Sequence, residues 1–162
     1  MSDSTNQKIE IELIPNFGLK DIPFGISRED VKEIMAKKFG EIDIIQRSSE
    51  TDCYLRNSLQ FTYEYDDTLT FIETAAPPPI YVKLLGINTW EIPGNDLLNM
   101  LCNYDLIDIE ASSKFGFRIF KNKHMVLWGL DIQYDQIGGY KIPKWGSIAI
   151  GDKRYYEKLL SL

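Results

Sequence analysis

Apolar and polar residues alternate strictly near the start of the chain, in the segment KIEIELI from Lys8 to Ile14. In an extended backbone Ile9, Ile11 and Leu13 share one face, and the two glutamates between them share the other. This pattern predicts a strand with one buried face.

The spacing of apolar residues changes to that of a helix after Ser27. Ser27 is a favoured N-cap residue, and Gly40 is typical of the position just after a helix end. Apolar side chains recur three or four residues apart at Val31, Ile34, Met35 and Phe39. A helix from Arg28 to Phe39 is therefore predicted.

A period of two returns in two aromatic hairpins. The first reads LQFTYEY-DD-TLTFIET from Leu59 to Thr74, with Asp66-Asp67 as its turn. The second reads FGFRIF-KNK-HMVLWGL from Phe115 to Leu130. Between the two hairpins, a second helix is predicted over Asp96–Tyr104.

A helix followed by a hairpin thus occurs on both sides of Pro77-Pro78-Pro79, which exclude a helix and favour a stiff extended spacer. The helix start and the first aromatic strand lie 34 residues apart in the first half (Ser27 to Phe61) and 22 residues apart in the second (Asn95 to Phe117). The amino-acid sequences of the two halves share almost no identity. A single α+β domain over residues 1–162 is predicted. Two degenerate repeats, 9–76 and 80–150, are an open alternative within it.

The remaining segments complete the predicted fold. Extended segments are expected at Ile42–Ile45, Ile80–Leu85, Leu106–Glu110 and Pro143–Ile150, the last as an edge strand or loop, and the polar residues Gln46–Asp52 carry no predicted element. A turn is expected at Gly138-Gly139 and a closing helix over Lys153–Leu162. The predicted class is α+β, with an antiparallel sheet or sheets and the helices packed on one face.

Composition and charge narrow the possible functions. The 162 residues are 44% hydrophobic and 26% charged, which is ordinary for a soluble domain. The 24 acidic and 18 basic residues give a net charge of −6 without a Lys/Arg cluster, so a basic protein partner is favoured over nucleic acid. The sequence has neither a signal-peptide pattern nor an apolar run approaching about 18 residues, so a cytoplasmic protein without a membrane partner is expected.

Residues that commonly carry catalysis are few. His124, the one histidine, lies beside Lys121 and Lys123 and is interpreted as a surface turn residue. Cys53 and Cys102 have neither metal-site nor redox spacing and are expected to be free thiols. The nucleophile-elbow, phosphate-loop and dinucleotide motifs do not occur in the sequence. We therefore expect no enzyme activity, no metal and no cofactor.

The remaining candidate is a protein-binding surface. Tyrosine supplies contact area at a small entropic cost, and carboxylates around it attract a basic partner. The candidate partner-binding residues are Tyr63, Glu64, Tyr65, Asp66 and Asp67 at the first hairpin tip, and Asp105, Asp108 and Glu110 on a predicted strand face. The alternative interpretation makes the tyrosines core residues and the acids solvated turn residues. Trp128 is expected in the core, and Trp90 and Trp145 are expected to be partly exposed.

The segment IPNFGLKDIPFGISREDVKEIMAKKFG, from Ile14 to Gly40, resembles a Gly-Ile-Ser-x-x-Asp-Val helix start of small bacterial domains. It is similar to the repeat unit of β-lactamase-inhibitory-protein-like folds, and to cytosolic bacterial immunity proteins. The second half departs from this pattern, with Pro93-Gly94-Asn95 at the corresponding place, and the chain shows no lipobox. The resemblance implies a protein-binding scaffold and transfers no catalytic residue.

The leading prediction is a bacterial immunity protein that neutralises a cognate toxin domain, for example a basic nuclease domain. One alternative is a structural or regulatory module that binds another protein. The other is a hydrolase that uses carboxylates alone, which requires two carboxylates about 5–9 Å apart in one cleft.

Overall fold

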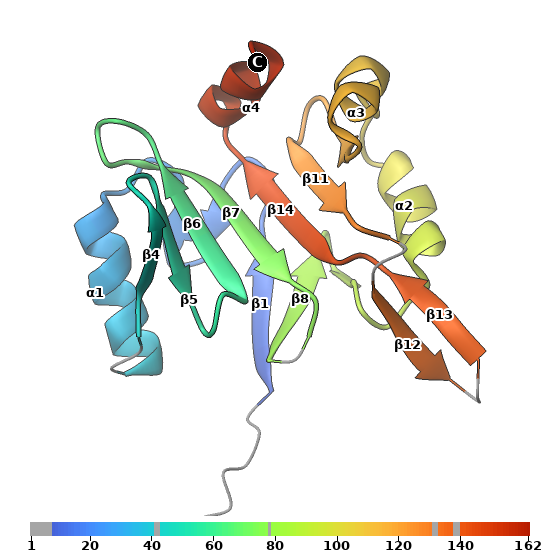
Figure 1. The fold of residues 1–162 in the computed structure, drawn as a ribbon, viewed down its shortest axis with the longest axis horizontal. Coiled ribbons are helices and arrows are strands. Elements are labelled where there is room, and N and C mark those ends of the chain that lie inside the picture. Colours follow the sequence, from blue (N-terminus) through green and yellow to red (C-terminus); the bar gives the residue numbers. More distant parts are fainter. Residues whose placement is uncertain (1–7, 41–42, 78, 131–132, 138–139) are drawn as a thin grey trace, which may run out of the picture.

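An antiparallel sheet of seven strands runs through the molecule in the order β10-β11-β14-β7-β6-β5-β4 (Figure 1). The computed structural model describes residues 8–40, 43–77, 79–130, 133–137 and 140–162. The strands of this sheet are β4 (Ile45–Ser48), β5 (Thr51–Tyr54), β6 (Leu59–Tyr63), β7 (Leu69–Ala75), β10 (Arg118–Ile119), β11 (Met125–Trp128) and β14 (Ser147–Gly151). Antiparallel pairing throughout this sheet, together with separate helices, confirms the α+β class.

The two halves of the chain meet in this sheet. β7, which precedes the three prolines, pairs with β14 near the C-terminus, and Ile72 lies opposite Ile150. Strand β6 of the first predicted hairpin lies beside β7, and strand β11 of the second predicted hairpin lies beside β14. A single domain and two fused repeats would both give one shared sheet, so the repeats 9–76 and 80–150 stay a prediction. Pro78 of the spacer lies outside the described residues.

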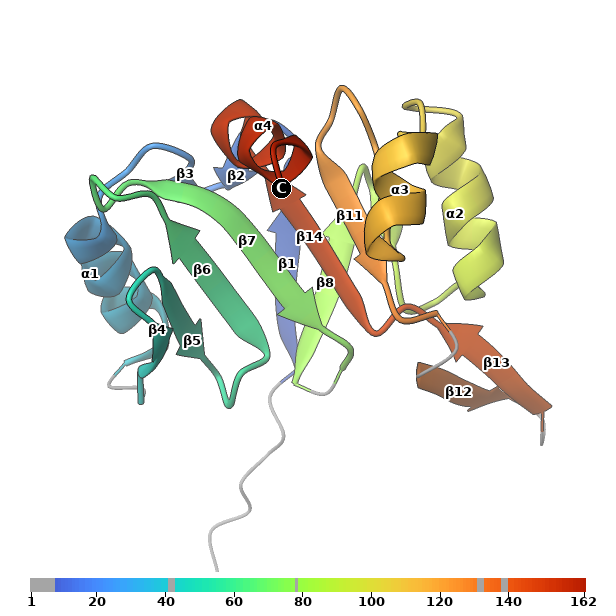
Figure 2. The same ribbon diagram turned by 45° about the horizontal axis from the view of Figure 1, so that its top comes forward.

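A smaller sheet closes the core behind the large one. Its order is β1-β8-β9, from β1 (Ile9–Leu13), β8 (Ile80–Leu84) and β9 (Ile87–Asn88), and β1 runs parallel to β8 (Figure 2). The alternation predicted for β1 is confirmed, because Ile11 and Leu13 are buried whereas both glutamates are exposed. Two short hairpins complete the strands, β2 (Gly18–Leu19) with β3 (Ile22–Pro23) and β12 (Gln133–Ile137) with β13 (Tyr140–Lys144).

Helix α1 (Arg28–Phe39) has the predicted bounds and caps. The side chain of Ser27 accepts the backbone N–H of Asp30 at 3.1 Å, and Gly40 follows the helix with a φ of 75°. The buried side chains of Val31 and Met35 join the core. Local signals were sufficient to define this element.

The first residue of α1 ties the helix to β5. Arg28 donates to both carboxylate oxygens of Asp52, at 2.9 and 2.6 Å, and its guanidinium lies over the ring of Tyr63. Asp52 is only 2% exposed. The hydrogen bonds to Asp52 raise the pKa of Arg28 above its usual value, so this cation stays charged.

The predicted strand Leu106–Glu110 is wrong. Asp108 instead caps helix α3 (Ile109–Phe115) by accepting the backbone N–H of Ala111 at 3.0 Å, and Gly116, with a φ of 73°, ends the helix. The alternation of apolar and acidic residues resembles a strand, but an aspartate cap and a left-handed glycine stabilise one short helix here.

The helices lie on both faces of the large sheet. Helix α2 (Gly94–Cys102), close to its predicted bounds, contributes two buried leucines to the core, as α1 contributes its own apolar residues. Helix α4 (Lys153–Leu160), the predicted closing helix, packs on the opposite face, where Tyr155 stacks on Phe71 with ring centroids 4.0 Å apart. Figure 2 shows α4 near the C-terminal end of β14 and the first residues of β7. The expectation of helices on one face therefore does not hold for α4.

Two segments form strands that the sequence did not predict correctly. Most of the polar stretch Gln46–Asp52 belongs to the hairpin β4–β5, in which Ile45 pairs with Cys53. Pro143–Ile150 is not an edge strand or loop throughout, because it contains most of β14, which lies between β11 and β7. Strand pairing depends on distant partners, which local polarity does not reveal. Ile42 and the Gly138-Gly139 turn lie outside the described residues.

The tryptophan predictions are partly wrong. Trp128 is 43% exposed, although the core was expected, because it alternates with the inward-facing Leu127. Trp145 is buried and donates its ring N–H to the carbonyl of Gly94 at 2.8 Å. Trp90 is partly exposed, as predicted.

Among the described helices, none is long and apolar enough to cross a membrane. Both cysteines are free thiols; Cys53 is buried and Cys102 is exposed.

Candidate functional site

The first hairpin tip divides its predicted binding residues between core and surface. Tyr63 is 1% exposed and packs in the core, so the alternative interpretation holds for this tyrosine. Tyr65, two residues on, is 95% exposed. Asp66 accepts the backbone N–H of Thr68 at 3.1 Å and its hydroxyl at 2.6 Å, and these bonds lower the pKa of Asp66. Asp67 completes the turn with a φ of 58°.

The carboxylates of this tip pair with cations of the same chain. Lys158 of α4 lies 3.9 Å from Glu64, and Arg154 of the same helix lies 4.0 Å from Asp66. Ion pairs of this length near the surface contribute little stability, but they reduce the negative charge offered to a partner.

The second group of predicted binding residues has mainly structural contacts. Asp105 is 7% exposed and accepts backbone N–H groups of Asn122 and Lys123, at 3.0 and 2.6 Å. Asp108, 8% exposed, caps α3 and accepts the hydroxyl of Tyr156 at 2.6 Å, which lowers the pKa of Asp108. Glu110 is exposed in the first turn of α3. Helix α4 thus contacts both groups, and several of these acids hold the chain's own C-terminal helix.

The candidate site is instead a groove on the face of the large sheet that points away from the core, here called the open sheet face. Its floor is low because the outward residues of β14 are small, namely Ser147, Ala149 and Gly151. A methyl group at Gly151 would lie 3.0 Å from Cδ1 of Tyr155 and 3.3 Å from Cδ2 of Phe71. Glycine therefore permits the aromatic stack that closes this end of the groove.

Large side chains form the walls of the groove. Tyr155 and Leu159 of α4 stand on one side, and Val126, Trp128 and Phe117 stand on the other. The open groove has a volume of about 480 Å³, within the range of sites that hold a small ligand or a few side chains. Exposed aromatic residues around such a depression are typical of protein-binding hot spots.

Two charged residues give the groove polarity. Glu73 on β7 points outward beside β14, and its Oε1 accepts the hydroxyl of Ser147 at 2.7 Å. Arg47 on β4 donates to the side-chain carbonyl of Gln60 at 2.9 Å. A carboxylate and a guanidinium thus lie on one largely apolar surface, and their positions would set how a ligand is oriented.

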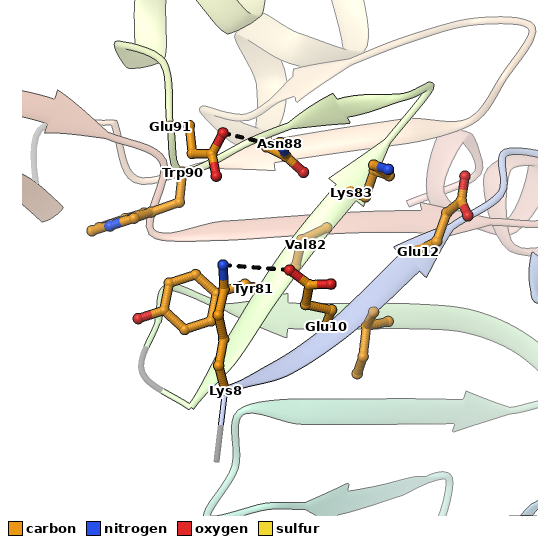
Figure 3. A pocket seen from close by; sticks show the side chains of 10 residues that line it. Lys8, Glu10, Glu12, Tyr81, Val82, Lys83, Asn88, Trp90 and Glu91 are labelled. Carbon is orange, nitrogen blue, oxygen red and sulfur yellow. Dashed lines mark hydrogen bonds and ion pairs between the residues drawn. The ribbon is translucent and has the colours of Figure 1, made fainter. Parts of the chain in front are cut away.

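A second depression, of about 360 Å³, lies on the outer face of the smaller sheet (Figure 3). Several of its charged residues already have partners: Lys8 pairs with Glu10 at 3.3 Å and lies over the ring of Tyr81 at 4.6 Å. Asn88 likewise donates to Glu91 at 3.1 Å. Because these contacts already engage several of its charged and polar groups, this surface is a weaker candidate than the open sheet face.

The described residues bring together no group of three or more His, Cys, Asp or Glu that could hold a metal ion. The one histidine serves packing: His124 stacks on Tyr156 with ring centroids 4.7 Å apart and adopts a φ of 50°. It is therefore less exposed than the predicted surface turn residue. Burial lowers the pKa of His124, and the charges of Asp105, Asp152 and Glu157 oppose this effect.

The depressed pKa of His124 predicts a loss of stability on mild acidification. The unfolded chain, with an ordinary pKa of 6.5, binds a proton at higher pH than the folded protein, so folding stability is present above this value and decreases as the pH falls through it. The melting temperature should decrease between about pH 7.5 and pH 5.5. His124→Asn, which tolerates the positive φ, should reduce that slope. Equal slopes for both proteins in thermal unfolding would contradict the prediction.

Part of this groove was visible in the sequence. Val126 and Trp128 alternate with inward residues, and Ser147, Ala149 and Gly151 form a row of small residues at the same period. The sequence offers no sign that the two rows become neighbours. A comparison of the chain with models of protein families, with curated proteins and with solved structures gave no match.

Proposed function

We propose that this chain is a bacterial immunity protein, a non-enzymatic inhibitor that binds a cognate toxin domain in the cytoplasm and blocks its active site. The observation that carries the proposal is the aromatic-walled groove of the open sheet face, with Trp128 43% exposed at its rim. An exposed tryptophan that lines a depression is a common anchor in protein interfaces.

The charge of the chain supports a basic partner. A net charge of −6 attracts a positively charged domain over a distance of about one Debye length, roughly 8–10 Å at moderate salt. Association is therefore expected to be fast at low ionic strength and slower as salt is added. Nucleic acid, which carries the same sign of charge, is not expected to bind.

The test mixes the purified protein with the product of the adjacent gene. We expect a complex in gel filtration and protection of cells that express the toxin. Trp128→Ala should weaken the complex by about 2 kcal/mol or more, roughly 30-fold in Kd. The matched control is Tyr81→Ala on the outer face of the smaller sheet, which should leave Kd unchanged.

Absence of both a complex and protection would overturn the immunity role. A Kd left unchanged by Trp128→Ala but increased by Tyr81→Ala would show that the interface does not lie on the open sheet face.

A further inference from the structure

Glu73 occupies an unusual place on the open sheet face. On β7 its outward neighbours two residues away are Phe71 and Ala75, so the carboxylate rises from an apolar row. It is half-buried, and the hydroxyl of Ser147, 74 residues along the chain, holds Oε1 at 2.7 Å. Within the described residues no Lys, Arg or His forms an ion pair with it.

A carboxylate in such surroundings has unused capacity. An ionised carboxylate offers about four acceptor positions, and one hydroxyl fills one of them. Because the carboxylate of Glu73 is partly removed from water, its remaining acceptor positions favour a bound cation that also loses its water. The position of Glu73 thus favours a positively charged ligand.

The walls of the groove favour an aromatic or long apolar group next to that cation. Trp128 and Phe117 provide one wall, and Tyr155 and Leu159 provide the other, over a floor that includes Ala149. Burial raises the pKa of Tyr155, with the charge of Glu73 as the second cause, which is consistent with the carboxylate lying close to this wall.

Arg47 is the competing feature. It is exposed on the edge strand β4, bonded to Gln60, and it would attract an anion to the same face. The two charges therefore make opposite predictions about the ligand. Two observations favour Glu73 over Arg47 as the anchor. The hydroxyl of Ser147 holds the carboxylate in place, and Glu73 lies on the inner strand β7, whereas Arg47 lies on the edge strand β4.

We propose that this groove binds a partner segment carrying an aromatic side chain next to a lysine or arginine, with the ring against Trp128 and the cation on the carboxylate of Glu73. This inference rests on the proposed function in that it specifies the partner's contact segment. The chemistry is testable without the partner, because a small molecule can carry both groups.

The probes are tryptamine, an indole with an ammonium group, and indole-3-propionate, an indole with a carboxylate. Each is titrated into ¹⁵N-labelled protein while the ring N–H of Trp128 and the amide N–H groups of Ser147 and Ala149 are followed by NMR. We expect tryptamine to shift these signals and indole-3-propionate to bind about tenfold more weakly.

Two variants test whether Glu73 causes the preference for tryptamine over indole-3-propionate. Glu73→Gln keeps an acceptor for Ser147 but removes the charge, and it should abolish the difference between the two probes. Glu10→Gln, on the outer face of the smaller sheet, is the matched control and should retain the difference. Should the first variant fold poorly, Arg47→Gln provides a second measurement, since tryptamine should then bind more tightly.

Equal affinities of the wild-type protein for both probes would overturn the proposal, and so would shifts at Trp90 and Tyr81 in place of Trp128. A preference for indole-3-propionate would identify Arg47 as the anchor and would also overturn it. These results are independent of the partner experiment. A toxin complex weakened by Trp128→Ala, with no preference between the probes, would leave the proposed function in place without this contact.

Discussion

Replacing Arg28 with methionine is expected to lower the free energy of unfolding by about 3 kcal/mol or more, as observed when one partner of a buried ion pair is removed. The substitution leaves the carboxylate of Asp52, 2% exposed, without the two hydrogen bonds it now receives at 2.6 and 2.9 Å. It also removes the bond from Arg28 to the carbonyl of Ser49 at 2.7 Å. Urea unfolding followed by circular dichroism measures the change.

The control lies on the same helix. Lys37 pairs with Glu33 at 2.8 Å, but both side chains are largely exposed. Lys37→Met should leave the urea midpoint unchanged. The double variant Arg28→Met with Asp52→Leu should recover much of the loss, because no unpaired charge stays buried. A destabilisation by Arg28→Met no larger than that by Lys37→Met would contradict a structural role for the Arg28–Asp52 pair.

The second large effect is expected at Asp105. Its carboxylate accepts the backbone N–H groups of Leu106, Asn122 and Lys123 at 2.7, 3.0 and 2.6 Å, and it thereby fixes the turn between β10 and β11. Asp105→Ala leaves these donors without their acceptor, at about 1 kcal/mol each, so a loss of roughly 3 kcal/mol is expected in chemical unfolding.

Glu110 provides the matched comparison. It was predicted from the sequence to share a binding role with Asp105, but it is exposed on α3. Glu110→Ala should change stability little. If Asp105→Ala also left stability unchanged but weakened the toxin complex, the surface role predicted from the sequence would be correct and the structural role assigned here would be wrong.

The elements predicted correctly from the sequence are those with strong local signals. Ser27 and Gly40 mark the two ends of α1, and the alternation in β1 and in the hairpin β6–β7 identifies their buried faces. The error at α3 has the same origin. Two local signals at this segment favour different structures: the alternation of apolar and acidic residues favours a strand, whereas the Asp108 cap favours a helix. The helix forms.

The binding residues were harder to predict because their exposure depends on distant contacts. Tyr63 and Tyr65 are equivalent in the sequence pattern, yet α1 and its arginine cover the first while the second stays in solvent. Trp128 lies beside the buried Leu127 and is exposed, since neighbouring residues of a strand point to opposite faces.

The sequence by itself determined the α+β class, the helix α1 with its caps, the aromatic hairpins, the closing helix and the net charge. Each of these depends on interactions within a few residues or on composition. The tertiary structure alone decided that β14 lies in the middle of the large sheet, that α4 packs on the opposite face from α1, and that Glu73 and Ser147 meet although 74 residues separate them. The physical reason is that strand pairing and side-chain burial are set by partners far away in the chain, whose positions no local pattern encodes.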